Sequence, residues 1–151
     1  MRLGRLNHVG VATSDMDAAI AFYRDVMGAT GIGEPFDMPR QGVRVCFVDT
    51  PGGSGPAGVG GTQIELIAPL GEDSPLSGFL ERNPLGGQHH VAFEVADIHE
   101  AHQWFTAHNK RILGPIRTGA HGTPVFFVHP RDMNGMLTEI MEAPDADSAH
   151  G

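Results

Sequence analysis

The sequence predicts an α+β fold in which two tandem βαβββ modules form a cupped mixed sheet. Two observations carry this prediction. The segment 6–12 recurs at 88–94 with the same alternation of side chains, so that His8 corresponds to His90. Two later segments also recur: 42–48 matches 122–128, and 62–67 matches the strand near 135–140 at an offset of 74, which places Glu65 on Glu139. A repeated order of this kind is typical of two copies of one supersecondary unit.

The first module begins with the strand 6–12, followed by a helix. Ser14, with Asp17 three residues later, predicts a helix start with a serine N-cap. Apolar residues then recur at helical spacing up to Gly28, which ends the helix. The remaining strands or extended segments of this module are predicted at 30–40, 43–48 and 62–67.

The segment 51–61 is rich in glycine, and two interpretations are open for it. A phosphate-binding loop needs a strand before its glycines and a helix N-terminus after them. Because a strand follows here, a flexible hairpin connection is favoured over a phosphate cradle.

A short helix is expected between the modules. Ser74 followed by Pro75 predicts an N-cap and the first helical position of this linker. In the second module, Asp97 with Glu100 three residues later predicts the helix start. The strands of that module are predicted near 88–95, 111–116, 124–129 and 136–142.

The chain is expected to be one domain. Its parts are module 1 (about 5–70), the linker helix (about 72–85) and module 2 (about 87–143). Residues 144–151 are small and polar, so a disordered tail is expected there.

Composition restricts the function. Ten basic and 18 acidic residues give a formal net charge of -8 at pH 7, which weighs against binding to nucleic acid or to anionic membranes. The single cysteine, Cys46, cannot form an internal disulfide, and the N-terminus has no apolar stretch typical of a signal peptide. A cytoplasmic protein is therefore expected. The candidates for binding an anionic small molecule are Arg40, Arg44, Arg117 and Arg131.

Each module contributes one histidine early and one glutamate late. These residues are His8 and Glu65 in the first module and His90 and Glu139 in the second. Imidazole and carboxylate ligands suit an octahedral divalent metal ion that keeps room for water or substrate. If the modules pack about a pseudo-twofold axis, the four side chains converge, and we predict that they bind a metal. The alternative is four ordinary surface groups, since the chain has nine histidines.

With these residues in place, the chain resembles the vicinal oxygen chelate superfamily and, within it, the methylmalonyl-CoA epimerase family. The resemblance covers about residues 5–143 and implies the glyoxalase/vicinal oxygen chelate fold. The segments that carry it are 6–12, 64–71, 73–80, 86–90, 119–122 and 127–131. The Ser-Pro-Leu-Ser-Gly-Phe-Leu, Gly-Ala-His-Gly and His-Pro-Arg sequences within them are more specific than the metal residues, which the superfamily shares.

The resemblance implies a metal-dependent epimerase that interconverts the (R) and (S) forms of methylmalonyl-CoA. A proton would leave the carbon between the thioester and the carboxylate, giving a metal-stabilised enolate, and would return to the opposite face. The acyl group is left open between methylmalonyl and ethylmalonyl, which differ by one methylene. Also implied are an acyl-CoA partner, a homodimer and a role in propionate metabolism. Cobalt is the expected cofactor, although nickel, manganese, zinc and magnesium accept the same ligands.

The catalytic base departs from part of the family. Some epimerases have a proposed glutamate base where this chain has Val45, and a glutamine where it has Glu65. Inversion needs acid/base groups on both faces of a planar intermediate. We therefore predict that Glu65 and Glu139 are the catalytic pair and alternate as metal ligand and base, as the similarity to glyoxalase I implies.

Four residues are expected to bind substrate: Gln41, Ser74, His121 and Arg131. Gln41 is a candidate for a hydrogen bond to the substrate carboxylate, with a simple turn role as the alternative. Arg131 keeps the positive charge of a lysine usual in the family, and the alternative for it is a solvated turn residue. A loop cap is the alternative for His121.

Two other functions compete with the epimerase. Glyoxalase I (lactoylglutathione lyase) would show the same four ligands, and turnover of methylglyoxal with glutathione would distinguish it. A non-catalytic small-molecule-binding module of the same fold is the second competitor, but such modules often lack the metal residues.

Overall fold

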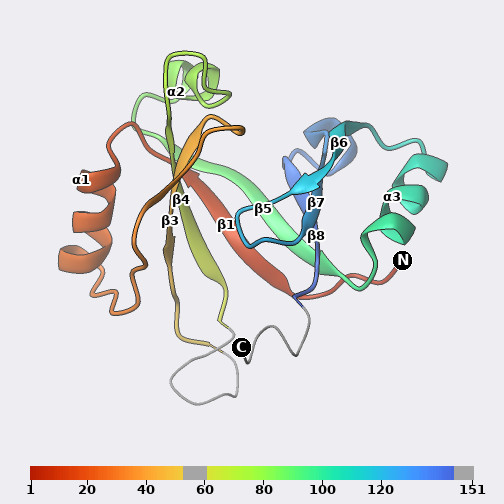
Figure 1. The fold of residues 1–151 in the computed structure, drawn as a ribbon, viewed down its shortest axis with the longest axis horizontal. Helices are drawn as coiled ribbons and strands as arrows, with labels where there is room; N and C mark the ends of the chain where they lie inside the picture. Colours follow the sequence, from red (N-terminus) through yellow and green to blue (C-terminus); the bar gives the residue numbers. More distant parts are fainter. Residues whose placement is uncertain (53–60, 145–151) are drawn as a thin grey trace. The chain divides into compact units, whose positions relative to one another are not determined.

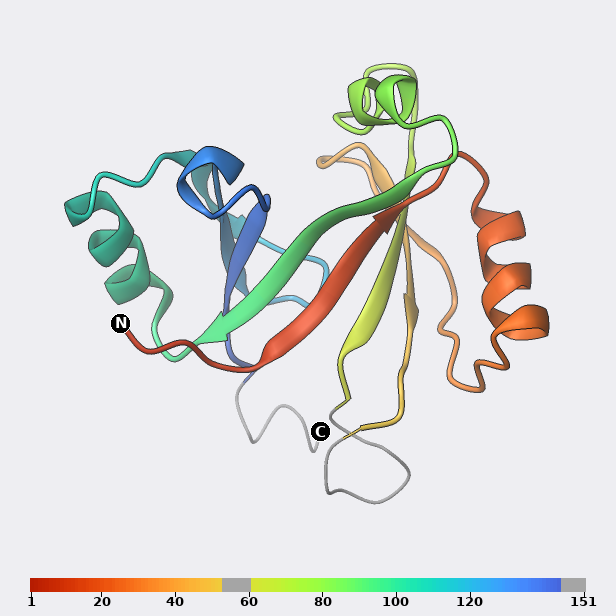
Figure 2. The same cartoon turned by 180° about the vertical axis from the view of Figure 1, so that it is seen from behind.

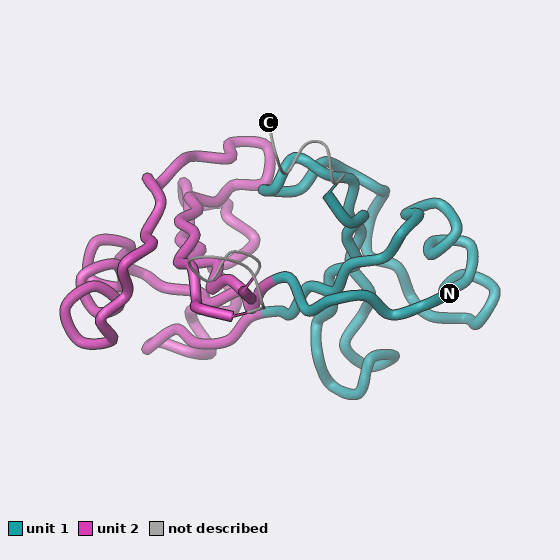
Figure 3. The backbone as a smooth tube through the Cα atoms, turned by 90° about the horizontal axis from the view of Figure 1, so that it is seen from below, with its two compact units in different colours: residues 1–7, 90–151 teal, residues 8–89 magenta. Residues whose placement is uncertain are grey.

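The computed structural model describes residues 1–52 and 61–144, and Figures 1 and 2 show its fold from two opposite sides. The chain divides into two compact units, residues 8–89 and residues 1–7 with 90–151 (Figure 3). The first seven residues thus belong with the second half of the chain. Most of the expected glycine-rich connection and nearly all of the expected tail lie outside the described residues.

The unit 8–89 contains the first β-α-β-β-β series. Its elements are β1 (Leu6–Ala12, of which the part from residue 8 belongs to this unit), α1 (Met16–Ala21), a π-helical turn (Phe22–Val26), β2 (Phe36–Met38), β3 (Val43–Val48), β4 (Gln63–Pro69) and α2 (Ser77–Arg82). The strands follow the order β2-β3-β4-β1. β1 is parallel to β4, and the other neighbours are antiparallel, so the predicted mixed sheet is confirmed in this unit.

The other unit repeats the series. Its elements are β5 (Gly87–Val95), α3 (Ile98–Ala107), β6 (Ile112–Thr118), β7 (Pro124–Val128), a 3-10 turn (Pro130–Asp132) and β8 (Thr138–Glu142). The strands follow the order β5-β8-β7-β6, again with one parallel pair, β5 and β8. The predicted βαβββ duplication is therefore confirmed.

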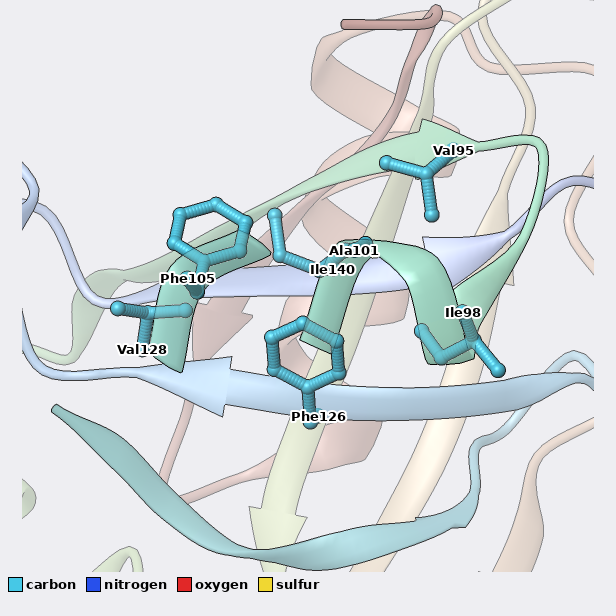
Figure 4. Close-up of a cluster of buried hydrophobic side chains, with 7 residues drawn as sticks. All are labelled: Val95, Ile98, Ala101, Phe105, Phe126, Val128 and Ile140. Atoms are coloured by element: carbon cyan, nitrogen blue, oxygen red, sulfur yellow. The ribbon is translucent and has the colours of Figure 1, made fainter. Parts of the chain in front are cut away.

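α1 and α3 each cover one face of the sheet in their own unit. In Figure 4, α3 lies over β5, β7 and β8. The buried cluster there consists of Val95, Ile98, Ala101, Phe105, Phe126, Val128 and Ile140. The equivalent cluster under α1 includes Met16, Cys46, Val48, Leu66 and Ala68, with Val11 packed against it. Because side chains alternate along a strand, the residues between these core positions face the opposite side of each sheet.

The starts of two helices differ from the prediction. The N-cap of α1 is Asp15, whose Oδ1 accepts a hydrogen bond from the Ala18 N–H at 3.0 Å, so the predicted Ser14 cap is wrong. Asp15 is set in place by Thr13, whose Oγ1 accepts from the Asp15 N–H. The predicted cap of α3 is confirmed, since Asp97 accepts from the N–H groups of His99 and Glu100.

The linker helix begins later than expected. α2 starts at Ser77, and its N-cap position, Leu76, has no side-chain hydrogen bond. The hydroxyl of Ser74 instead donates to the Gly42 carbonyl at 2.7 Å and accepts from the Leu76 N–H. Because that hydroxyl binds a distant carbonyl, the predicted helix start at Ser74 is wrong.

Within the described ranges, no helix is both long and apolar enough to cross a membrane.

Candidate metal centre

His8 and Glu65 lie on the two parallel strands of the unit 8–89. Glu65 on β4 pairs with Gly10 on β1, two residues after His8. His8 Nε2 lies 3.4 Å from Glu65 Oε2. His8 is 0% exposed and Glu65 6% exposed. An imidazole and a carboxylate are thus held together in a site that excludes most water.

His90 and Glu139 occupy the equivalent positions in the other unit. Glu139 on β8 pairs with Ala92 on β5, again two residues after the histidine. Both side chains are buried, with exposed fractions of 4% for His90 and 8% for Glu139. The predicted equivalence of the two histidine–glutamate pairs is therefore confirmed at the level of strand register.

A phenylalanine lies beside each histidine, and sequence reasoning did not single it out. The ring of Phe47 meets that of His8 edge-on at a centroid distance of 6.5 Å. The ring of Phe127 meets that of His90 in the same way at 5.5 Å. Phe47 and Phe127 are also the cross-strand partners of the two glutamates. The alternation of the strands 43–48 and 124–128 was the signal that would have placed these rings with the glutamates.

The pKa of the Glu139 carboxyl is strongly shifted from its ordinary value. Burial raises the pKa of this carboxyl to about 7, and the positive charge of Arg117 acts in the opposite direction. A buried carboxylate with a raised pKa gains stability from a nearby cation. The donor set of two imidazoles and two carboxylates is one that divalent transition metals accept, so the residues fit a metal of this class.

Val45, at the position where the resemblance implies a base, is fully buried in β3. It is 1% exposed and pairs with Ile67 on β4 and Phe36 on β2. Phe47, two residues later on the same strand, pairs with Glu65. Val45 therefore shares a sheet face with Glu65 and gives that face a methyl-bearing surface instead of an acid.

Two of the four predicted substrate-binding residues belong to the unit 8–89. Gln41 lies in the turn before β3, where its N–H donates to the Met38 carbonyl. Ser74 is 6% exposed and holds the Gly42 carbonyl through its hydroxyl. The two residues therefore lie on either side of one contact, between the turn at Gly42 and the segment before α2.

The other two belong to the second unit. His121 is half-buried, and burial lowers its pKa, with Glu94 opposing and Arg5 reinforcing that shift. Glu94 is itself buried and accepts hydrogen bonds from Arg5 and Asn7. Arg131 is exposed, and its N–H donates to Nδ1 of His129 at 3.1 Å. The geometry thus places His121 near a buried carboxylate and leaves the Arg131 side chain toward solvent.

Comparison with known proteins gives consistent matches over most of the chain. Residues 7–127 match the sequence profile of the Glyoxalase/Bleomycin resistance protein/Dioxygenase superfamily. The chain is 47% identical over 140 residues to the ethylmalonyl-CoA/methylmalonyl-CoA epimerase of Cereibacter sphaeroides, which covers 91% of this chain and 97% of that protein. It is 42% identical over 142 residues to the mitochondrial methylmalonyl-CoA epimerase of Homo sapiens, covering 93% and 75% of the two chains.

Solved structures agree with the sequence matches. A methylmalonyl-CoA epimerase in complex with methylmalonyl-CoA and NH4+ gives a TM-score of 0.83 at 32% identity, covering 95% of this chain and 97% of that one. The methylmalonyl-CoA epimerase of Mycobacterium tuberculosis gives a TM-score of 0.80 at 30% identity, covering 95% and 91%.

Proposed function

The chain belongs to the Glyoxalase/Bleomycin resistance protein/Dioxygenase superfamily, and from that premise we propose that it is a methylmalonyl-CoA epimerase. The fold predicted from the sequence is the fold of this family. The enzyme interconverts the (R) and (S) forms of methylmalonyl-CoA by moving one proton at the carbon between the thioester and the carboxylate. The observation that carries this function is identity of 42% or more to named epimerases over nearly the whole chain.

We propose that a divalent metal ion is held by His8, Glu65, His90 and Glu139. Support comes from the burial of all four residues, the matched strand register of the two pairs and the donor types. When bound, such a metal supplies Lewis-acid stabilisation of the negative charge that develops on the substrate.

Glu65 and Glu139 are proposed as the acid/base pair. Support comes from their equivalent places in the two modules and from Val45, which brings no carboxylate to its position on β3. In the metal-free site, burial raises the pKa of Glu139 to about 7. A bound divalent metal would lower this pKa, so Glu139 would act as acid or base when it is not a metal ligand. One glutamate removes the α-proton, and the other returns a proton to the opposite face of the planar intermediate.

The acyl-CoA is proposed to bind at a site formed with Gln41, Ser74, His121 and Arg131. Ser74 acts through Gly42, because its hydroxyl already binds that carbonyl. The similarity to an ethylmalonyl-CoA/methylmalonyl-CoA epimerase supports ethylmalonyl-CoA as a second substrate. A pocket that accepts one extra methylene discriminates only about 10- to 200-fold.

The comparisons do not favour glyoxalase I, since the named relatives and structures are methylmalonyl-CoA epimerases. Cobalt as the native metal, the homodimer, the cytoplasmic location and the role in propionate metabolism stay predictions. The single-domain organisation and the disordered tail stay predictions as well.

The direct test is proton NMR of (S)-methylmalonyl-CoA in D2O with the purified protein. The assay is run on the protein as purified, after chelation, and after addition of cobalt. We expect metal-dependent loss of the α-proton signal together with loss of optical asymmetry. Absence of exchange with every divalent metal offered would reject the epimerase, and methylglyoxal with glutathione would then be the substrate to try.

A further inference from the structure

Arg117 lies on the same sheet face as the glutamate and histidine of its unit. On β6, Arg117 pairs with Val125 of β7, and two residues later on β7 Phe127 pairs with Glu139 of β8. Residues two apart on a strand share a face, so Arg117, Phe127 and Glu139 all face away from α3. His90 contacts the ring of Phe127 on that face.

An irregularity in β6 gives Arg117 this position. The register shifts between Leu113 and Arg117, because four residues of β6 span the distance that two residues span on β7. Gly114, at the start of the shift, has a φ of 75°, a conformation that glycine adopts without strain. Bulges of this kind re-aim side chains and are over-represented next to active sites.

The guanidinium of Arg117 is supported by a ring and is available to an anion. Its Cζ lies 5.4 Å from the centroid of the Phe127 ring, a cation–π distance. In the part of the chain that the structure describes, Arg117 forms no ion pair with a carboxylate within 4.0 Å. Its charge nevertheless acts on the nearby Glu139 carboxyl.

The first module has an aromatic side chain at the equivalent position. Phe36 on β2 pairs with Val45, as Arg117 pairs with Val125. The ring of Phe36 lies 6.0 Å from that of Phe47, as Arg117 lies over Phe127. Both modules thus cover their histidine-contacting phenylalanine, one with a ring and the other with a cation. In the first module, an uncharged ring is enough to cover the phenylalanine. The positive charge of Arg117 is therefore not explained by its packing on Phe127.

We propose that Arg117 determines specificity by binding the free carboxylate on the reacting carbon of the substrate. This assignment rests on the proposed epimerase function and names the chemical class that the site selects: acyl-CoA thioesters with a second, ionised carboxylate on the α-carbon. A guanidinium presents parallel N–H donors that match the two oxygens of a carboxylate. The Phe127 ring limits the orientations of that guanidinium before substrate binds.

The proposal is tested by isothermal titration calorimetry, in which the cobalt-loaded protein is titrated with two acyl-CoA ligands. Malonyl-CoA carries the α-carboxylate, and propionyl-CoA lacks it. We expect Arg117→Gln to weaken malonyl-CoA binding about 10- to 100-fold, as for the loss of a hydrogen-bonded charge, and to leave propionyl-CoA binding unchanged. Arg117→Lys should restore part of the preference for malonyl-CoA, since lysine keeps the positive charge but lacks the paired N–H donors of a guanidinium. The matched control is Arg24→Gln, which removes another exposed arginine, paired with Asp25 on the π-helical turn.

If Arg117 has only a structural role, Arg117→Gln should bind malonyl-CoA and propionyl-CoA more weakly by the same factor. That result would overturn the proposal, as would an unchanged preference for malonyl-CoA over propionyl-CoA. The NMR assay on the unmodified protein separates this outcome from failure of the function. Epimerisation with an unchanged preference in Arg117→Gln rejects the role of Arg117 alone. An Arg117-dependent preference without epimerisation rejects the function and keeps the carboxylate site.

Discussion

At the scale of single residues, substitution of the two glutamates gives the clearest test of the proposed chemistry. If Glu65 and Glu139 act on opposite faces of the substrate, Glu65→Gln and Glu139→Gln should each lower kcat by about 10²- to 10⁴-fold, the range typical of lost acid/base catalysis. The measurement is racemisation of (S)-methylmalonyl-CoA, with metal content determined for each variant. Full epimerisation by Glu65→Gln would show that the two-glutamate hypothesis is wrong.

The raised pKa of Glu139 makes a separate prediction about stability. Its folded-state pKa of about 7 lies above the ordinary value of 4.5, so the folded protein binds this proton more tightly than the unfolded chain does. Below about pH 4.5 this carboxyl does not lower the free energy of unfolding. As pH rises, it lowers that free energy progressively, by about 3 kcal/mol above pH 7. We expect urea unfolding of the metal-free protein to show this loss of stability between pH 5 and pH 8.

Glu139→Gln should abolish most of this dependence of the free energy of unfolding on pH, since an amide does not ionise. A slope that persists unchanged in the metal-free variant would mean that another group titrates. Added metal should flatten the slope in the original protein, because a cation offsets the buried charge.

At the scale of elements, the strands were predictable and the helix starts only partly so. β3 begins and ends where the alternating pattern of 43–48 placed it, because alternation records burial on two faces directly. The start of α1 was not resolved by pattern, since Thr13, Ser14 and Asp15 are all residues that cap helices. Which one caps depends on backbone geometry, and it is Asp15, in an extended conformation, that accepts the hydrogen bond from the Ala18 N–H.

Capping by aspartate predicts the effect of three alanine variants. Asp15→Ala and Asp97→Ala should each lower the free energy of unfolding by about 1 kcal/mol, because each removes an acceptor for N–H groups in the first helical turn. Ser14→Ala is the control and should change it by less than about 0.5 kcal/mol. Urea denaturation measures all three, and a larger loss for Ser14→Ala than for Asp15→Ala would restore the serine cap.

Arg117 shows the limit of element-level prediction of the site, since the sequence named it only as one of four arginine candidates for binding an anion. The four proposed metal ligands were found because the repeat aligns them, and their strand register agrees. The edge strand β6 contains a register shift that has no counterpart in β2, so no repeat alignment points to Arg117. A bulge depends on pairing with a distant strand and leaves only a weak local signal, here Gly114.

At the scale of the whole molecule, metal removal should lower stability as well as activity. A ligand that binds only the folded state at about 1,000 times its Kd stabilises by about 4 kcal/mol. For a chain of this size, we expect chelation to lower the unfolding temperature by roughly 10 °C in differential scanning fluorimetry. His8→Ala and His90→Ala should each remove the response to metal, and a response that survives either substitution would show that the histidine is not a ligand.

The two compact units also show what the repeat could not reveal. The sequence divides into modules at about residue 70, whereas the first seven residues join the second unit. Gly4 explains this contact, since its N–H donates to the Glu94 carbonyl at 2.9 Å and a Cβ there would collide with that oxygen. This placement of the first seven residues depends on tertiary contacts, which a repeat alignment does not record.

The contrast between Phe36 and Arg117 bears on why the two modules share one gene. In a homodimer of separate modules, any substitution would appear in both copies, so both positions would carry a ring or both a cation. Fusion of the copies into one polypeptide lets each position mutate independently. The two positions can then differ, and selection can tune the charge at one without altering the ring at the other.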